Sequence, residues 1–175
     1  LNYRLCRAQD TQFFNKLTVN ETIAFAACLR MGKQNIHDED IQEQTHRLVQ
    51  TFGLQACEHT KVGGVDSGGP SVAGISGGER RRLAIACELV GRGTKAQSRV
   101  VILDEPTSGL DAFQAQTVID KLQQLAHTMG DAVVTTIHQP RSSSFLMFDS
   151  FCLLSGGGRV CYSGRRDDVR KKLKV

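Results

Sequence analysis

The chain has 175 residues, 40% of them hydrophobic, and its 22 Lys and Arg residues against 18 Asp and Glu leave a net charge of +4. This balance excludes a charge-dominated disordered chain, and no apolar run approaches the roughly 18 residues that a membrane-spanning helix needs. The basic residues are scattered and Trp is absent, so a nucleic-acid-binding surface is not indicated. The cysteines form no C-x-x-C pair, which favours reduced thiols in a cytosolic compartment. Three lie in apolar stretches and are predicted to be buried: Cys28, Cys87 and Cys152.

The residues between 11 and 60 are predicted to be mainly helical. Thr18-Val-Asn-Glu21 has the spacing of a capping box and predicts a helix over 18–31. A second helix is predicted over 38–52, because its apolar residues fall on one helical face: Ile41, Leu48, Val49 and Phe52. The glycine-rich stretch 62–75 follows neither the helical nor the strand period and is predicted to be a loop.

The second half of the chain alternates helical and strand patterns. Helices are predicted over 77–90, 111–129 and 142–148, and strands over 99–103, 132–137, 151–154 and 159–162. Strands rich in Val and Ile between amphipathic helices predict an α/β fold with a mostly parallel sheet. The last two strands are joined by Ser-Gly-Gly-Gly and predict a hairpin. The tail, 165–175, is charged and expected to be frayed.

Two adjacent carboxylates, Asp104 and Glu105, follow a strand of four apolar residues. In α/β sheets the carboxyl ends of strands line the ligand crevice, and carboxylates there favour a cation or a polar ligand. An acidic turn ended by Pro106 is the alternative. His138 ends the next parallel strand, 138 − 105 = 33 residues later, which accommodates one strand–helix–strand unit. Glu105 and His138 are therefore expected at the same edge of the sheet.

Two further motifs begin helices. In Ser76-Gly77-Gly78-Glu79 the serine and glutamate form another capping box, and the glycine pair leaves backbone N–H groups open to an anion. Asp111, in Ser-Gly-Leu-Asp, is a natural N-cap. Capping alone could explain both motifs.

The order of these motifs resembles the nucleotide-binding domain of ATP-binding cassette (ABC) proteins. Gln9, the Ser76 motif, the Asp104–Glu105 strand, the Asp111 motif and His138 match in turn its Q-loop, signature, Walker B, D-loop and switch histidine. The flanking sequences Leu-Thr-Val-Asn-Glu-Thr-Ile and His-Gln-Pro-Arg are similar to the G subfamily of eukaryotic exporters. The resemblance covers about residues 1–164.

The resemblance implies a P-loop NTPase-like α/β cassette. The whole chain, 1–175, would form one partial domain: a helical subdomain and loop over about 11–75, between Q-loop and signature, a core over about 76–164, and the charged tail. ATP and Mg²⁺ are the expected ligands, and the expected partners are a second cassette in a head-to-tail dimer and the transporter's transmembrane domain, with no nucleic acid. The cassette would lie at the cytosolic side of a membrane.

The resemblance also implies roles for individual residues. Glu105 would act as general base or orient the attacking water, and His138 would stabilise the γ-phosphate. Asp104 would hold Mg²⁺, and Gln9 would reach the same ion and water. The nucleotide held by the partner cassette would be bound by Ser76, Gly77, Gly78 and Glu79. Asp111 would help to join the two sites across the dimer interface.

One expected motif is absent from the 175 residues. No G-x-x-x-x-G-K-[ST] sequence occurs, and the only Gly-Lys pair is Gly32-Lys33, followed by Gln34. We therefore expect a fragment that begins after the P-loop, with negligible ATPase by itself, from a cassette that powers export. The alternative is a catalytically silent module that binds a partner cassette through its signature; a degenerate gene copy also stays open. A nucleic-acid-associated ABC ATPase is disfavoured by the exporter-like flanking sequence.

Overall fold

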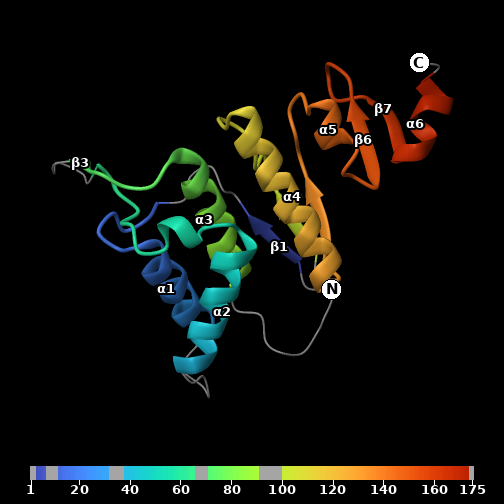
Figure 1. The fold of residues 1–175 in the computed structure, drawn as a ribbon. Helices are drawn as coiled ribbons and strands as arrows, with labels where there is room; N and C mark the ends of the chain where they lie inside the picture. The colour runs from blue at the N-terminus through green and yellow to red at the C-terminus, as the bar shows by residue number, and fades with distance from the viewer. Residues whose placement is uncertain (1–2, 7–11, 32–37, 66–70, 91–99, 174–175) are drawn as a thin grey trace. The chain divides into compact units, whose positions relative to one another are not determined.

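The computed structural model describes residues 3–6, 12–31, 38–65, 71–90 and 100–173. They divide into two compact units, Leu1–His138 and Gln139–Val175, which are described separately (Figure 1). The first unit contains a group of helices and a three-stranded sheet. This is the α/β architecture that the alternation of strands and helices predicts.

Three helices form the helical part of the first unit. They are α1 (Val19–Met31), α2 (Asp38–Thr51) and α3 (Gly77–Leu89), with the short helix η1 (Gln55–Cys57) after α2. Helix α1 begins as predicted, because the Glu21 carboxylate accepts from the Thr18 N–H at 2.8 Å and the Thr18 hydroxyl accepts from the Glu21 N–H at 3.2 Å. Helix α1 packs against both α2 and α3 (Figure 1).

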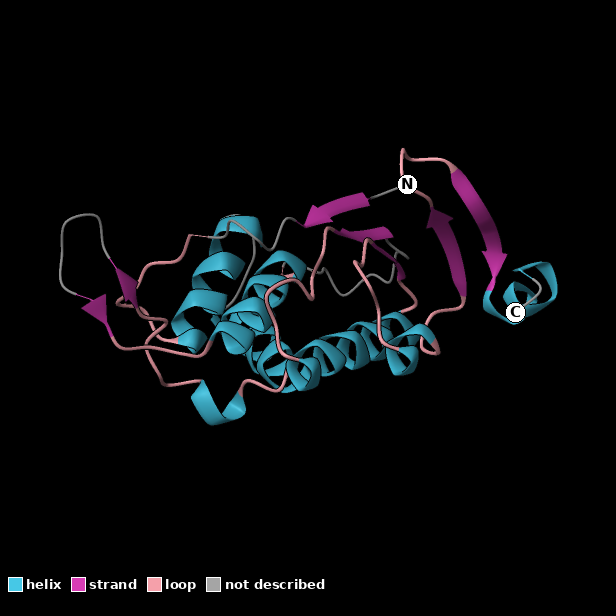
Figure 2. Cartoon of the chain, turned by 90° about the horizontal axis from the view of Figure 1, so that it is seen from above, coloured by secondary structure: helices cyan, strands magenta, loops and turns pink. Residues whose placement is uncertain are grey.

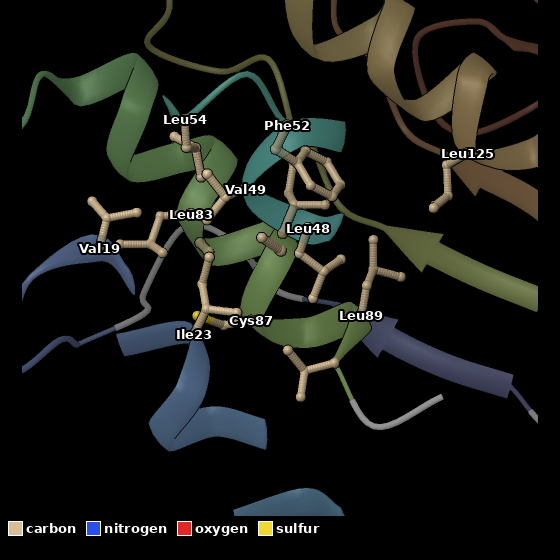
Figure 3. Packing of buried hydrophobic residues seen from close by; sticks show 14 of the residues in the cluster. Val19, Ile23, Leu48, Val49, Phe52, Leu54, Leu83, Cys87, Leu89 and Leu125 are labelled. Carbon is tan, nitrogen blue, oxygen red and sulfur yellow. The ribbon is translucent and has the colours of Figure 1, made fainter. Parts of the chain in front are cut away.

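The core lies between these helices. Figure 3 shows Val19 and Ile23 of α1 directed toward Leu83 and Cys87 of α3, with Phe52, which directly follows α2, beside Leu48 of that helix. The predicted apolar face of α2 is confirmed, since Leu48 and Val49 are buried and Ile41 packs partly buried against the cluster. The same cluster continues into the sheet region through Val101, Leu103, Val118, Leu122 and Leu125.

The three-stranded sheet of the first unit is parallel, with strand order β1-β4-β5. Its strands are β1 (Tyr3–Cys6), β4 (Val100–Leu103) and β5 (Ala132–Thr135), and α4 (Ala112–Met129) connects β4 to β5. Strand β1 was not predicted, because four residues of mixed polarity carry no clear period and pair with β4, far along the chain. Strand β5 is two residues shorter than predicted.

The prediction of a loop over residues 62–75 is partly wrong. Within this stretch, β2 (Gly64–Val65) pairs antiparallel with β3 (Ser71–Val72). These strands appear as short magenta arrows in Figure 2, and two residues are too few to display a period of two. Gly63 and Gly74 allow two backbone segments to pass very close to each other. A Cβ on Gly74 would lie 2.5 Å from the Cα of Gly63, which itself has a positive φ of 72°.

The second unit consists of α5 (Ser142–Phe145), the hairpin of β6 (Ser150–Leu154) and β7 (Val160–Arg165), and α6 (Arg166–Leu173). The predicted hairpin is confirmed. The expected fraying of the tail is wrong for residues 166–173, which form the helix that carries the C-terminus in Figure 2. Asp167 and Asp168 lie in its first turn, where carboxylates favour a helix, and Val169 is buried.

The cysteine prediction holds for one residue of three. Cys87 is buried, whereas Cys28 and Cys152 are exposed, because Ala27 and not Cys28 lies on the inner face of α1 and Cys152 lies on the outer face of β6. Cys57 is buried as well. Burial raises the pKa of the Cys87 thiol to about 12 and that of Cys57 to about 11, so both thiols stay protonated near neutral pH. In the described ranges, no helix combines the length and hydropathy needed to cross a bilayer.

Candidate functional site

The two carboxylates and the histidine follow the ends of neighbouring parallel strands. Strand β4 pairs with β5 up to Leu103 and Thr135, and the Thr136 N–H donates to the Leu103 carbonyl at 3.1 Å, which extends the pairing by one residue. Asp104 and His138 are exposed and Glu105 is half-buried. The expectation that Glu105 and His138 follow adjacent strands of one sheet is therefore confirmed.

Thr136, which the sequence analysis did not select, connects these two strand ends. Its hydroxyl donates to Asp104 Oδ1 at 2.8 Å and accepts from the Glu105 N–H at 2.9 Å. A threonine at a strand end is too common to be a sequence signal. Its role becomes visible only once the register of β4 against β5 is known.

Glu105 has an unusual backbone conformation. Its φ is +43°, and the only other described non-glycine residue with a positive φ is Gln139, at +52°. A left-handed conformation is costly for a residue with a Cβ, and it persists where surrounding contacts determine it. After Glu105 the chain turns, with the Ser108 N–H donating to the Glu105 carbonyl at 3.1 Å.

A second residue missed by the sequence analysis, Arg81, reaches the same turn from α3. Its guanidinium is buried and donates from Nε to the Pro106 carbonyl at 3.0 Å and from Nη2 to the Glu105 carbonyl at 2.5 Å. Burial lowers the pKa of Arg81 and the charge of Glu105 opposes that shift. Arginine remains protonated in such surroundings, so Arg81 brings a positive charge beside the turn.

The Ser76 motif forms the capping box that begins α3. The Glu79 carboxylate accepts from the Ser76 N–H at 2.7 Å and from its hydroxyl at 2.8 Å, and the Ser76 hydroxyl accepts from the Glu79 N–H at 3.3 Å. A Cβ on Gly77 would meet nothing within 4 Å, so the first turn is open there. A Cβ on Gly78 would lie 2.5 Å from the Gln114 side chain of α4, which would have to move.

The capping box gives the stability of the chain a pH dependence. Hydrogen bonds from Ser76 lower the pKa of Glu79 from its usual 4.5, so its contribution is fully present above that value and is lost as the pH falls through the lowered one. We expect Glu79→Gln to flatten this part of the profile, measured by urea unfolding between about pH 3 and 7.

A matched variant identifies the source of that change. Glu43→Gln removes an exposed carboxylate from α2 and should leave the profile unchanged. Some dependence should persist in Glu79→Gln, because Thr18 lowers the pKa of Glu21 in the same way at the start of α1. Equal profiles for Glu79→Gln and the parent chain would contradict the assignment.

Two predicted site residues remain, Asp111 and Gln9, and only Asp111 lies within the residues that the structure describes. Asp111 caps α4, and its Oδ1 accepts from the Gln114 N–H at 2.9 Å, which is the capping alternative. Gln9 lies outside the described residues. Among the described residues, no group of three or more His, Cys, Asp or Glu could hold a metal ion. A Mg²⁺ ion does not need such a group, because it is bound through one or two carboxylates together with substrate phosphates and water.

The sequence matches one family of known proteins. Residues 5–108 match the sequence profile of the ABC transporter family. ABC transporter G family member 7 of Arabidopsis thaliana is 43% identical over 156 residues, which are 89% of this chain and 20% of that protein. ABC transporter G family member 25 of the same plant is 43% identical over 160 residues, 91% of this chain and 22% of that protein.

More distant relatives agree. An uncharacterised ABC transporter ATP-binding protein/permease of Saccharomyces cerevisiae is 36% identical over 91% of this chain and 11% of its own length. The solved structure of cbiO1 from Clostridium perfringens, part of the ABC transporter complex cbiONQ, superposes with a TM-score of 0.71 at 20% identity, over 99% of this chain and 61% of that one. The chain thus spans about a fifth of the length of the first plant relative, and the solved structure supports the same fold.

Proposed function

Because the chain belongs to the ABC transporter family, with the G family among its relatives, we propose that it supplies the signature, Walker B, D-loop and switch histidine of an ATP-hydrolysing cassette that powers export across a membrane. The observation that carries the proposal is that Asp104–Glu105 and His138 follow the ends of two adjacent parallel strands, β4 and β5, and that Thr136 binds both Asp104 and Glu105. Phosphoryl-transfer sites in α/β proteins lie at such edges.

The chemistry of these side chains fits ATP with Mg²⁺. When bound, Mg²⁺ neutralises charge on the phosphates. Asp104 has an exposed carboxylate whose Oδ1 is oriented by the Thr136 hydroxyl, and with Gln9 it would hold the ion, since carboxylate oxygens suit this hard cation.

Glu105 and His138 would act on the water and the phosphate. The Glu105 carboxylate would accept the proton of the attacking water or orient that water. The exposed imidazole of His138 would donate a hydrogen bond to the γ-phosphate and stabilise its charge in the transition state.

The open first turn of α3 supports a contact with a nucleotide held by a second cassette. The first turn is open at Gly77, whose N–H lies at a helix N-terminus that attracts anions, and Gly78 beside it is buried against Gln114 of α4. Ser76 and Glu79 would form the cap beside that nucleotide, and Asp111 would join the two sites across the head-to-tail dimer. The transmembrane domain of the same transporter would hold this domain at the cytosolic side of the membrane. Residues 11–75 would form the helical subdomain and loop, and 76–164 the core.

The test compares the chain alone with a chimera. The 175 residues contain no G-x-x-x-x-G-K-[ST], so the isolated chain should bind ATP weakly and hydrolyse none above background. A chimera in which these residues replace the matching segment of the Arabidopsis thaliana G family member 25 should hydrolyse ATP, measured by phosphate release. Turnover by the isolated chain, or an inactive chimera beside an active relative, would contradict the proposal.

A catalytically silent half-site is the second candidate, favoured by an intact signature cap. It predicts ATP-dependent association of the 175-residue chain with a P-loop-bearing cassette, measured by light scattering. Gly77→Glu should weaken this association, because the new carboxylate would enter the open first turn and repel phosphate. Association that ignores ATP would contradict this candidate.

A further inference from the structure

We propose that Arg81 and Thr136 are positioning residues that hold the Glu105 peptide from both sides and so direct its carboxylate. The inference rests on the proposed function, because it gives Glu105 a reason to be positioned. It concerns two residues to which the sequence analysis assigns no role.

The contacts surround one residue. The Glu105 N–H donates to the Thr136 hydroxyl at 2.9 Å, and the Glu105 carbonyl accepts from Arg81 Nη2 at 2.5 Å. The Arg81 Nε–H donates to the next backbone carbonyl, that of Pro106, at 3.0 Å. Both backbone groups of Glu105 are thus bound by side chains from other elements.

The backbone of Glu105, which lies between these two contacts, has an unfavourable conformation. Glu105 has a φ of +43°, a conformation that a glutamate does not hold by its own preference. A side chain follows its Cα–Cβ bond, so a change of φ at Glu105 would swing the carboxylate away from its direction. The two contacts therefore stabilise the direction of the side chain as well as the turn.

Arg81 and Thr136 belong to different parts of the fold, and each connects Glu105 to another motif. Arg81 lies on α3, about one and a half turns after Ser76 at the signature end. Thr136 lies two residues before His138. A displacement of either element would reach Glu105 through a single hydrogen bond, so Glu105 would respond both to the signature helix and to the segment between β5 and His138.

The first experiment measures amide exchange of the 175-residue chain by NMR. Thr136→Val removes the hydroxyl at nearly constant shape, and exchange of the Glu105 amide should accelerate at least about tenfold, the effect of losing about 1.4 kcal/mol of protection. Thr136→Ser should restore slow exchange. Thr135→Val is the matched control, because its hydroxyl bonds the Thr136 carbonyl and not Glu105.

The second experiment uses the chimera and separates kcat from KM. Arg81→Met should lower kcat for ATP at least about tenfold, with KM changed less than about twofold, because a displaced base impairs the chemical step and not binding. Thr136→Val should lower kcat at least as much and should also raise KM, because its hydroxyl orients Asp104 as well. Arg81→Lys should restore only part of kcat, since an ammonium cannot reproduce the two-carbonyl fork. Arg30→Met controls for stability, because Arg30 also binds a backbone carbonyl of α3, that of Glu88 at 2.6 Å, far from Glu105.

The outcomes distinguish the two proposals. Unchanged exchange of the Glu105 amide in Thr136→Val would overturn the positioning role. A loss of kcat in Arg81→Met no greater than in Arg30→Met at equal stability would also overturn it. A chimera without turnover would refute the proposed function, and the exchange result would still decide whether Thr136 holds the Glu105 peptide.

Discussion

Glu105→Gln is expected to lower kcat for ATP hydrolysis by the chimera by about 10²- to 10⁴-fold, the range that positioned general bases contribute. The carboxamide has nearly the same shape as the carboxylate, so the strained turn and its bonds to Thr136 and Arg81 should persist. It cannot accept a proton from water at neutral pH. Steady-state phosphate release at saturating ATP measures the effect.

Binding and a control variant complete this test. The affinity for ATP should change little, because the substitution acts on the chemical step. Glu88→Gln makes the same chemical change on α3, where Glu88 pairs with Arg30 at 2.7 Å, and should leave kcat unchanged. Undiminished turnover by Glu105→Gln would refute the assignment of Glu105. A parallel loss of ATP binding would refute a role confined to chemistry.

Phe52→Ala should lower the free energy of unfolding by about 3–5 kcal/mol, the cost of replacing a buried aromatic ring by a methyl group. Phe52 is 0% exposed and belongs to the cluster between α1, α2 and α3 (Figure 3). The ring leaves a cavity that these packed helices fill only in part. Urea unfolding of the 175-residue chain, followed by circular dichroism, measures the loss.

The chain offers its own control for this prediction. Phe113, on α4, is 81% exposed, and Phe113→Ala should stay within about 0.5 kcal/mol of the parent chain. Equal losses in the two variants would contradict the assignment of the core. Because α3 contributes Leu83, Ile85 and Leu89 to this core, begins at the Ser76 cap and carries Arg81, a disturbed core should also disturb the site.

Local features of the fold could be predicted because they depend on neighbouring residues. The capping boxes at Thr18 and Ser76, the amphipathic α2 and the Asp111 cap follow from side chains within about one helical turn of each other. Strand β1 and the β2–β3 pair escaped prediction, because their hydrogen bonds connect distant or very short segments. Cys28 was misplaced because an apolar surrounding sequence does not say which helical face a residue occupies.

The sequence by itself determined the family of this chain, the order of its motifs and the residues that carry carboxylate, imidazole and capping chemistry, since these reside in residue type and spacing. Only the tertiary structure decided which side chains hold Glu105. Thr136 and Arg81 reach it through the parallel register of β4 with β5 and through the packing of α3 against the turn at Pro106. Such contacts join residues that the chain keeps far apart, and they form only when the apolar core brings α3 and the sheet together.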